Sequence, residues 1–321
     1  MQVHRDLEAL PPFTRAVVTI GAFDGVHCGH RSIIAQLKEE ARRCGGETVI
    51  ITFDPHPRMV LSPGKTKLQL LTTLEEKIYL LEDQQVDHLV VVPFTRAFSE
   101  LSAEAYVSDF LVSKFHPHVI IIGYDHHFGH HREGNIELLH RMKARFGFRV
   151  VEIPGQVVHD LTVSATKIRH YIEQGEVGLA RELLGYPYFL SRPVVHGDGM
   201  GHQLGFPTAN LFVGDGQKLI PASGVYAAQV RIPTPVGQAP PAAGRVYPGA
   251  ASIGYRPTFG GKDLRVEVYL LDFEGDLYGE QVQLSFFDYI RPELPFDGPE
   301  ALIAKMRQDV AIVRERLKQY G

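Results

Sequence analysis

The chain contains 321 residues, of which 44% are hydrophobic and 22% are charged, values that are ordinary for a folded globular protein. Its 33 Lys and Arg against 37 Asp and Glu give a net charge of −4, which argues against a protein whose main task is coating nucleic acid or anionic membranes. Two cysteines, no signal-peptide pattern and no apolar run near the ~20 residues that span a bilayer indicate a soluble cytoplasmic protein.

Short apolar runs alternate with helical patterns in the first half of the chain. Continuous runs rich in Val and Ile, spaced by amphipathic segments, are typical of strands buried on both faces of a parallel sheet. A helical pattern of apolar residues begins at Ile33 and is ended by Gly45, and a second such pattern begins at Leu74. We therefore expect residues 1–185 to form a parallel α/β domain. The expected strands are 16–20, 48–53, 89–93, 119–122 and 149–153.

The second half changes character near Gly185, where glycine and proline become dense. Strand patterns at 224–232, 264–271 and 281–287 with turn residues between them predict an antiparallel sandwich or barrel over residues 186–321. The chain ends on a helix, for which Asp297 and Glu300 form a capping-box pattern around Pro299. The apolar face of this helix is formed by Leu302, Met306, Val310, Val313 and Leu317.

The segment 21–30, Gly-Ala-Phe-Asp-Gly-Val-His-Cys-Gly-His, directly follows the first expected strand and opens the first helix. Glycines there let the backbone turn tightly and approach a ligand, and a helix N-terminus offers N–H groups that suit phosphate. His27 and His30 could add imidazole donors to a triphosphate. A plain glycine-rich turn with two surface histidines fits the same residues. The expected nucleotide-binding residues of this segment are Gly21, Phe23, Asp24, Gly25 and Gly29.

A second phosphate pattern follows the fifth expected strand. Ser164 or Thr166 would cap a helix there, with Arg169 one turn later. An ordinary capped helix with a solvated arginine explains these residues equally well. Because the two patterns stand at the carboxyl ends of strands one and five, together they suggest a nucleotide crevice.

Four segments, 21–30, 52–57, 123–129 and 164–169, resemble the FMN adenylyltransferase module of bacterial FAD synthetases, within the nucleotidylyltransferase superfamily with its Rossmann-like fold. The resemblance implies that His27 and His30 bind and polarise the ATP phosphates. It implies the following further roles: Ser164, Thr166 and Arg169 hold the triphosphate from the other side, Asp125 contacts nucleotide or flavin, and His56 and Arg58 lie near the FMN phosphate.

Histidines also cluster after the fourth expected strand, at His126, His127, His130 and His131. The glycines around them indicate a loop rather than a helix, so the usual spacing of metal ligands is not evident. A metal-dependent enzyme built on this cluster is therefore one alternative, beside phosphate or flavin contacts and a solvated surface.

In the second half, a glycine-rich loop runs into Pro-Thr-Ala-Asn at 207–210. Successive glycines let backbone N–H groups converge on phosphates, and Thr208 and Asn210 carry the oxygen ligands that Mg²⁺ prefers. Glu267 stands on the non-core side of an alternating strand, where it could act as a general base or simply be a solvated residue paired with Arg265. For the glycine-rich segment, an ordinary loop of a β-rich domain is the alternative. The expected nucleotide-binding residues here are Gly199, Gly201 and Pro207.

The segments 201–210, 254–259, 266–273, 277–279 and 289–291 resemble riboflavin kinase, in the order of that family. The resemblance implies a six-stranded Greek-key β-barrel followed by the terminal helix. It implies that Thr208 with Asn210 positions Mg-ATP and that Glu267 deprotonates the riboflavin 5′-hydroxyl. The implied flavin-binding residues are Arg256, Thr258 and Arg291.

The combination is similar to the prokaryotic bifunctional riboflavin kinase/FMN adenylyltransferase family. It implies that ATP, with Mg²⁺, converts riboflavin to FMN and FMN to FAD, in a monomer or weak homo-oligomer that needs only small-molecule partners. Ala165, His127, Met200 and His202 depart from the family pattern. An enzyme with one working half and a non-catalytic flavin carrier are therefore alternatives.

Overall fold

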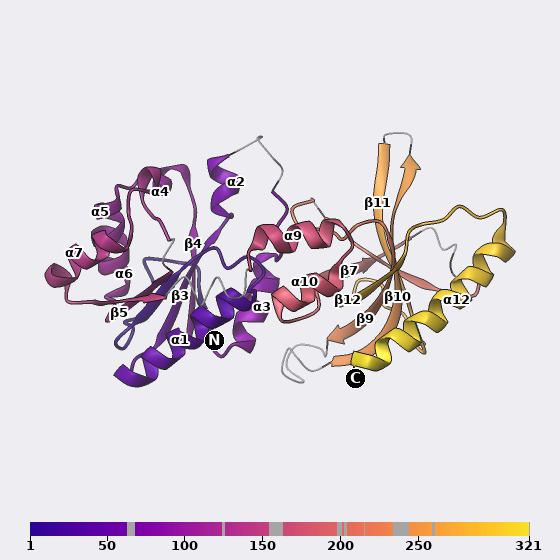
Figure 1. The fold of residues 1–321 in the computed structure, drawn as a ribbon, viewed down its shortest axis with the longest axis horizontal. Coiled ribbons are helices and arrows are strands. Elements are labelled where there is room, and N and C mark those ends of the chain that lie inside the picture. The colour runs from indigo at the N-terminus through magenta and orange to yellow at the C-terminus, as the bar shows by residue number, and fades with distance from the viewer. Residues whose placement is uncertain are drawn as a thin grey trace. The chain divides into compact units, whose positions relative to one another are not determined.

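The computed structural model describes residues 1–62, 68–123, 126–153, 163–197, 201, 204–214, 216–233, 244–258 and 261–320, with only the backbone at 256–258, 261 and 262. Contacts divide the chain into two compact units, Met1–Ala165 and Thr166–Gly321 (Figure 1). Each unit is described by itself below. Among the described residues, no helix combines the length and apolar character needed to cross a membrane.

The first unit contains a six-stranded sheet in the order β1-β4-β3-β2-β5-β6, in which every neighbouring pair is parallel. The strands are β1 (Gln2–His4), β2 (Val17–Ile20), β3 (Thr48–Asp54), β4 (His88–Pro93), β5 (Val119–Gly123) and β6 (Arg149–Ile153). All five expected strands are present. No pattern in the sequence indicates β1, because its three residues are too few to show one and it pairs only at the edge, where Val3 lies beside Leu89.

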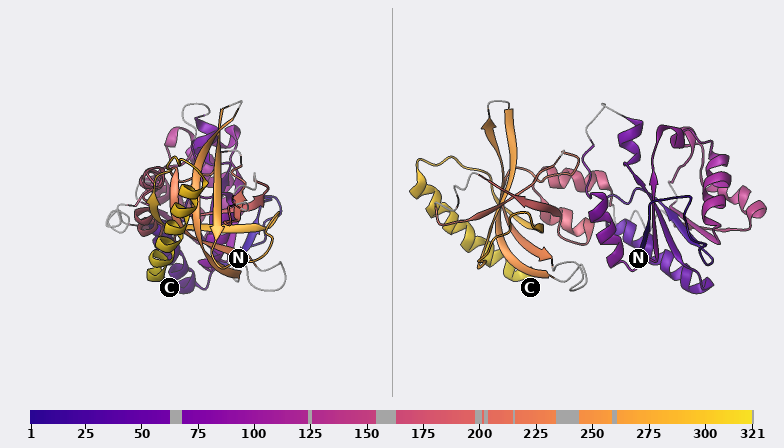
Figure 2. Two further views of the ribbon diagram at one scale, coloured as in Figure 1. Left: turned by 90° about the vertical axis from the view of Figure 1, so that its right-hand side faces the viewer. Right: turned by 180° about the vertical axis from the view of Figure 1, so that it is seen from behind.

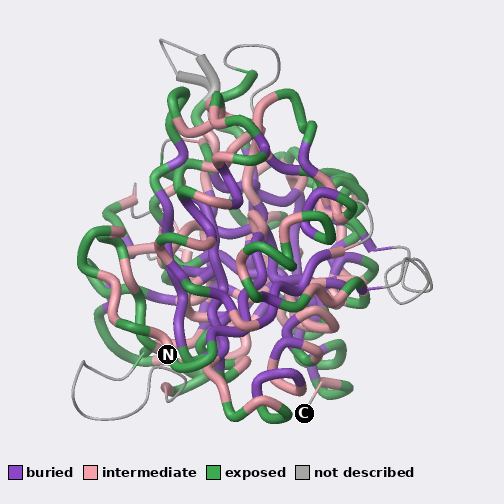
Figure 3. Tube along the Cα trace, turned by 90° about the vertical axis from the view of Figure 1, so that its left-hand side faces the viewer, coloured by how far each residue is buried: buried purple, intermediate pink, exposed green. Residues whose placement is uncertain are grey.

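Helices flank this sheet on its two faces (Figures 1 and 2). They are α1 (Cys28–Cys44), α2 (Pro57–Leu61), α3 (Leu74–Asp83), α4 (Arg96–Ser99), α5 (Ala103–Ala105), the π-helix η1 (Tyr106–Val112), α6 (Ser113–Phe115), the 3₁₀-helix η2 (His130–Arg132) and α7 (Ile136–Phe146). The central strands β2, β3, β4 and β5 consist almost entirely of buried residues, the class drawn in purple in Figure 3. The expected helix end at Gly45 is confirmed, since this residue caps α1 with a left-handed φ of 62°.

The strand order of this sheet reverses between β2 and β5. Connections run outward from β2 through β3 to β4, and then cross back to β5 and β6. In open parallel sheets, ligands bind at the carboxyl ends of the strands at such a reversal. The turn at Gly21 and the loop after Gly123 therefore face the expected ligand position.

The second unit is a closed antiparallel barrel in the order β10-β11-β8-β7-β12-β9, as the kinase resemblance implied. Its strands are β7 (Phe189–Val195), β8 (Thr208–Leu211), β9 (Gly224–Pro233), β10 (Gly244–Thr258), β11 (Gly261–Leu270) and β12 (Gln281–Arg291). The helix α12 (Pro299–Leu317) and the 3₁₀-helix η3 (Lys318–Tyr320) follow. Val313 and Leu317 of α12 are buried against Ala227, Leu271 and Phe287.

The expected capping box of the terminal helix is wrong. The N-cap residue is Gly298, which has no side chain to accept a hydrogen bond, and no side-chain cap forms. Pro299 occupies the first turn, as expected. With Gly298 at the N-cap, Asp297 lies one residue before the cap, and Glu300 is the second helical residue rather than the third that a capping box requires. The start of α12 therefore depends on the fixed backbone angle of proline.

Two helices precede the barrel, α9 (Ala165–Glu173) and α10 (Val177–Leu184). The backbone N–H of Ala222 donates to the Ile172 carbonyl at 3.2 Å, and a side chain at Gly175 would meet the rings of Tyr226 and Tyr289. The described contacts of both helices thus include the barrel unit, although the expected boundary placed them in the first domain. That boundary at residue 185 stays a prediction.

Candidate active sites

The first site is a cavity of about 640 Å³ at the carboxyl ends of β2 and β5. The turn after β2 contributes Gly21 and Phe23 to its lining, and the start of α1 contributes His30. Tyr106 also lines it, with its ring 5.1 Å from that of Phe128 and tilted by 25°. Further aromatic lining residues are Phe53, Phe94 and Phe98. The cavity therefore suits a flat aromatic ligand that carries a charged end.

His27 and His30 stack on each other at the N-terminus of α1, with ring centroids 3.8 Å apart and planes 16° from parallel. Nδ1 of His27 accepts a hydrogen bond from the backbone N–H of His30 at 3.4 Å, so Nε2 is the donor of the neutral His27 ring. Gly29 permits this stack, because a Cβ there would lie 3.2 Å from the His27 ring.

The environment of His30 disfavours its protonation. Burial, together with the charges of His27 and Lys77, holds the pKa of His30 well below its usual value. Among the described residues, the buried Nδ1 of His30 has no hydrogen-bond partner. A neutral ring with an unsatisfied nitrogen, placed in a cavity wall, is suited to hydrogen bonding with a ligand.

Asp24 of the same turn contacts protein rather than the cavity. Its carboxylate accepts hydrogen bonds from the backbone N–H groups of Leu71 and Thr72 at 3.2 and 3.0 Å. The N–H of Gly25 in turn donates to the Thr72 hydroxyl at 3.1 Å. The described contacts of Asp24 therefore show it shaping the turn, and its expected nucleotide contact stays a prediction.

The other expected residues of this site belong to further elements of the chain. His56 caps α2 by accepting from the N–H of Arg58 at 3.1 Å. Ser164 directly precedes α9, which carries Thr166 and a buried Arg169. Because Ser164 belongs to the first unit and the other two to the second, their joint role stays a prediction. Asp125, like Gly199, Met200 and His202 in the second half of the chain, lies outside the described residues.

The histidine cluster is a lining of this cavity. His126, His127, His130 and His131 all contribute to its wall. Within the described part of the chain, no three His, Cys, Asp or Glu side chains gather as a metal site. The cluster is thus placed where the ligand contacts would be, beside Phe128.

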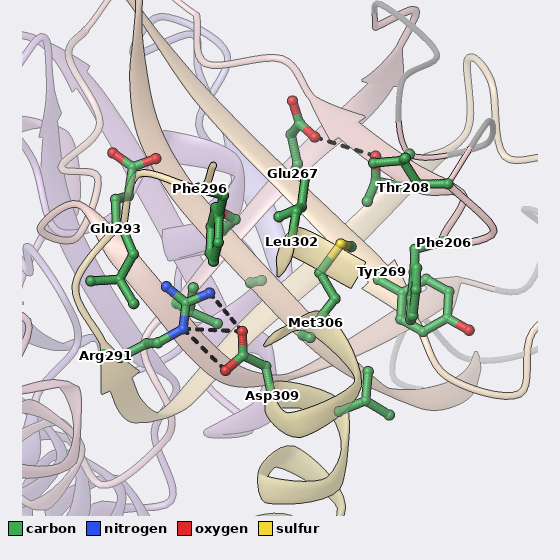
Figure 4. Close-up of a pocket in the computed structure, with 18 of the residues that line it drawn as sticks. Phe206, Thr208, Glu267, Tyr269, Arg291, Glu293, Phe296, Leu302, Met306 and Asp309 are labelled. Carbon is green, nitrogen blue, oxygen red and sulfur yellow. Dashed lines mark hydrogen bonds and ion pairs between the residues drawn. The ribbon is translucent and has the colours of Figure 1, made fainter. Parts of the chain in front are cut away.

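The second site lies on the outside of the barrel, where two cavities of about 240 and 410 Å³ share the lining residues Gly201, Thr208 and Asn210. Figure 4 shows the smaller of the two. Glu267 lines the smaller cavity, and its Oε2 accepts a hydrogen bond from the Thr208 hydroxyl at 3.3 Å. In β11, Val266 and Val268 are buried while Glu267 points outward, as the alternation predicted.

Strand register brings these polar groups together. Glu267 of β11 stands opposite Asn210 of β8, and Tyr269 stands opposite Thr208. Side chains two residues apart on a strand share a face, so the four line one strip of the barrel surface. A Cβ at Gly197 would come within 2.3 Å of the Asn210 amide, and one at Gly201 within 2.4 Å of the Phe206 carbonyl. Both glycines therefore permit a close backbone approach at their own positions.

The two cavities beside the barrel differ in their lining residues. The smaller is lined by apolar and aromatic side chains, among them Phe206, Leu302 and Met306 (Figure 4). The larger reaches the loop 273–278, where the Tyr278 ring stacks on His196 at 4.0 Å. The arrangement therefore provides two flat-ligand pockets that meet at Thr208.

Arg291 lines the smaller cavity, but its guanidinium is already paired. It makes a two-pronged ion pair with Asp309 of α12, with Nη2 at 2.7 Å from Oδ2 and Nε at 3.1 Å from both carboxylate oxygens. The pair fastens α12 over the cavity (Figure 4). A direct flavin contact of Arg291 stays a prediction. Of Arg256 and Thr258, only the backbone, at the end of β10, is described.

Several lining residues were missed from the sequence. Phe94 and Phe128 follow closely on strand ends, which is the signal that could have found them. Asp309 is a carboxylate inside the apolar stripe of the terminal helix, between Met306 and Val313. A charge at such a position indicates a buried partner.

The fold and the two sites define a two-part class of protein, in which a parallel α/β unit and a closed β-barrel each carry a cavity with aromatic side chains in its lining. Comparison with known proteins agrees with this class. The family model for FAD synthetase matches residues 11–167, and the model for riboflavin kinase matches residues 184–317.

A Listeria monocytogenes protein named bifunctional riboflavin kinase/FMN adenylyltransferase is 41% identical over 296 residues, 91% of this chain and 90% of its own. An Escherichia coli K12 protein of the same name is 36% identical over 304 residues, 95% and 93% of the two chains. A crystal structure of a Streptococcus pneumoniae protein described as a macrolide-efflux protein has 29% identity and a TM-score of 0.82, covering 98% of both chains.

The chain belongs to the family of bifunctional riboflavin kinase/FMN adenylyltransferases. The expectations of family, of fold class and of a bifunctional transferase in FAD biosynthesis from riboflavin are therefore confirmed. The two family models cover different units, so the two activities correspond to different parts of the chain.

Proposed function

We propose that the barrel unit phosphorylates riboflavin to FMN with Glu267 as the general base, and that the first unit then adenylylates FMN with His27 and His30 at the transferring phosphates. ATP is the co-substrate of both steps. The observation that supports the proposal is the hydrogen bond from Thr208 to Glu267 where two cavities share lining residues. One cavity would take the flavin and the other the nucleotide, with Glu267 as the base between them.

In the kinase step, the apolar cavity beside Leu302 and Met306 would hold the isoalloxazine ring, with the ribityl chain toward Glu267. Glu267 takes the proton of the 5′-hydroxyl as that oxygen attacks the γ-phosphorus of ATP, and ADP leaves. The pocket at Tyr278 would receive the adenine ring by stacking. Each substrate thereby reaches Thr208 from its own side.

Magnesium fits this site, because Thr208 and Asn210 place a hydroxyl and an amide oxygen, both hard ligands, beside a carboxylate. A bound Mg²⁺ would neutralise the charge of the ATP phosphates. Thr208 also orients Glu267 through their hydrogen bond, so that the carboxylate faces the substrate hydroxyl.

In the adenylyltransferase step, the FMN phosphate attacks the α-phosphorus of ATP and pyrophosphate leaves. No basic residue is needed, since the attacking phosphate is already ionised. The N-terminus of α1 and the rings of His27 and His30 would stabilise the charge that develops on the phosphates. The aromatic wall at Tyr106 and Phe128 would hold the isoalloxazine ring.

The remaining site assignments belong to the same proposal. Ser164, Thr166 and Arg169 would bind the triphosphate, Asp125 the nucleotide or flavin, and His56 with Arg58 the FMN phosphate. In the kinase half, Gly199 and Pro207 would join the nucleotide site, and Arg256, Thr258 and Arg291 the flavin site. The adenylyltransferase domain would span 1–185 and the kinase domain 186–321. We also propose a cytoplasmic enzyme, monomeric or weakly associated, that binds no nucleic acid.

The proposal is tested by incubating the purified chain with riboflavin, ATP and Mg²⁺ and resolving the three flavins by chromatography over time. FMN should rise and then fall as FAD accumulates. FMN alone would mean that only the kinase half works, which the departures at Ala165 and His127 make a specific alternative. Bound riboflavin without any conversion would favour the carrier.

A further inference from the structure

A buried lysine, Lys77, lies beneath the phosphate-binding turn of the first unit and has no role in the reaction derived above. Its side chain on α3 is only 6% exposed, and Nζ donates a hydrogen bond to the Thr52 hydroxyl at 3.1 Å. Thr52 is fully buried near the end of β3 and donates in turn to the Ala22 carbonyl at 3.1 Å. Burying a cation costs free energy, so its position calls for a compensating interaction.

The turn that receives this hydrogen bond has an unfavourable backbone. Phe23 and Val26 have positive φ angles of 48° and 35°, on either side of Gly25 at 78°. Residues with a Cβ adopt this left-handed region only where the surrounding structure enforces it. The turn between β2 and α1 therefore needs anchors to keep its shape.

Two anchors hold the turn from outside. The first is the chain of hydrogen bonds from Lys77 through Thr52 to Ala22. The second is Thr72, whose hydroxyl accepts from the Gly25 N–H while Asp24 accepts from the Thr72 N–H. Burial lowers the pKa of Lys77, and the negative charges of Asp24 and Asp54 oppose that shift, so Asp24 couples this lysine to the second anchor as well. One ammonium group thus links the turn, β3 and α3.

We propose that Lys77 is a positioning residue of the adenylyltransferase site, which through Thr52 and the charge of Asp24 holds the Gly21–Gly25 turn in the shape that receives the ATP phosphates. The inference rests on the proposed function of this unit. Lys77 contacts no substrate in this account, since neither Lys77 nor Thr52 is among the residues that line the cavity. It acts through the backbone that it fixes.

The charge of Lys77 also reaches His30, which provides a readout that packing alone would not move. The groups that face His30 are His27 on its own helix and Lys77 on α3, while Asp24 and Asp54 face Lys77. The positive charge of Lys77 lowers the pKa of His30. Its removal, which also leaves the two carboxylates unbalanced, raises that pKa.

The test compares Lys77→Met and Thr52→Val with the matched control Lys38→Met. Lys38 lies on α1 and donates to the Gln84 carbonyl at 2.9 Å, away from the turn. Three quantities are measured: FAD formation from supplied FMN, FMN formation from riboflavin, and the NMR titration of the His30 ring, assigned with His30→Gln. Thermal unfolding establishes that each variant is folded at the assay temperature.

We expect Lys77→Met to lower kcat for FAD formation about ten- to a hundredfold, because a buried hydrogen bond from a charged group is lost. Its His30 ring should titrate at higher pH than in the unaltered chain. Thr52→Val should lower kcat by about tenfold without moving the His30 titration, since the charge stays. FMN formation by the barrel unit should remain unchanged in both, and Lys38→Met should behave as the unaltered chain.

Either variant forming FAD at the original rate while folded would overturn the proposal, and so would an unmoved His30 titration in Lys77→Met. If Lys77→Met does not fold, Thr52→Val decides by its rate alone. Failure of the proposed function is separate, because then the unaltered chain would form no FAD from FMN and ATP.

Discussion

In the proposed reactions, the two candidate sites use different residues to transfer a phosphoryl group and an adenylyl group from ATP. In the barrel, the Glu267 carboxylate lies beside Thr208 on the outer strip of β-strands. In the first unit, the stacked rings of His27 and His30 stand at the N-terminus of α1, and burial holds the pKa of His30 well below its usual value. The difference follows from the nucleophiles: a riboflavin hydroxyl must lose a proton to react, whereas the FMN phosphate has already lost it.

The two sites also differ in which parts of the fold keep their side chains in position. The barrel site is fixed by strand register, which places Glu267, Thr208 and Asn210 with no unusual backbone. The first site depends on a turn with positive φ at Phe23 and Val26, which needs anchors from β3 and α3. We therefore expect the barrel site to fail when a reacting group is removed, and the first site to be sensitive also to residues behind it.

The largest expected effect is that of Glu267→Gln on the kinase step. Loss of the base should lower kcat for FMN formation by a factor of about 10² to 10⁴. FAD formation from supplied FMN should be unchanged, which is measured by chromatography of the flavins. Glu280→Gln, at an exposed residue of the same unit, is the matched control. A loss of both activities in Glu267→Gln would break the division between the two sites.

The converse variant is His27→Ala. Loss of a donor at the phosphates should lower FAD formation by about 10²- to 10³-fold while FMN formation from riboflavin continues. His140→Ala, on the exposed face of α7, serves as the control. Equal rates of FAD formation in His27→Ala and the unaltered chain would contradict the role given to the stacked histidines.

A third prediction concerns the ion pair that fastens α12. Asp309→Ala leaves the Arg291 guanidinium without its buried partner, so the free energy of unfolding of the barrel unit should fall by about 3 kcal/mol. Denaturant unfolding measures this change. The KM for riboflavin should rise, because α12 carries Leu302 and Met306 into the cavity. Lys318→Ala, at an exposed pair with Glu315, should change stability by less than about 0.5 kcal/mol.

The smallest expected effect is a pH dependence of the first unit. The pKa of His30 is lowered by burial in the folded chain, so the unfolded chain binds more protons below about pH 6.5. Stability is therefore complete above that pH and falls as the pH decreases toward the folded pKa. The pKa of His4 is also lowered, by burial and by the charge of His88, and this adds to the slope. Unfolding between pH 5 and 8, with His30→Gln as comparison, should show a shallower slope in the variant.

The sequence predicted most of the first sheet and little of the barrel's strand order. Five strands of the sheet are continuous apolar runs, which any buried parallel strand must show. The strands β7, β8 and β10 had no such pattern, since the barrel has one covered and one open face and many turn residues. The capping box failed because Gly298, with no side chain, took the cap position.

Within the sites, the sequence indicated residues that belong to short motifs, but it did not indicate residues whose place depends on tertiary packing. Glu267 and Thr208 belong to short motifs whose spacing along a strand shows their face. Lys77 and Asp309 lie within helical stripes, and their partners Thr52 and Arg291 are distant in sequence. Which side chain meets a buried charge depends on how helices pack on sheets, and no local pattern determines that.

The assignment of one reaction to each unit is tested most directly by mixing two full-length variants, each impaired in one reaction. Glu267→Gln and His27→Ala are each incubated alone with riboflavin, ATP and Mg²⁺, and then together in equal amounts. We predict that neither alone forms FAD at an appreciable rate and that the mixture does, because FMN made by one variant is adenylylated by the other. A mixture that forms no more FAD than the two variants separately would contradict the account.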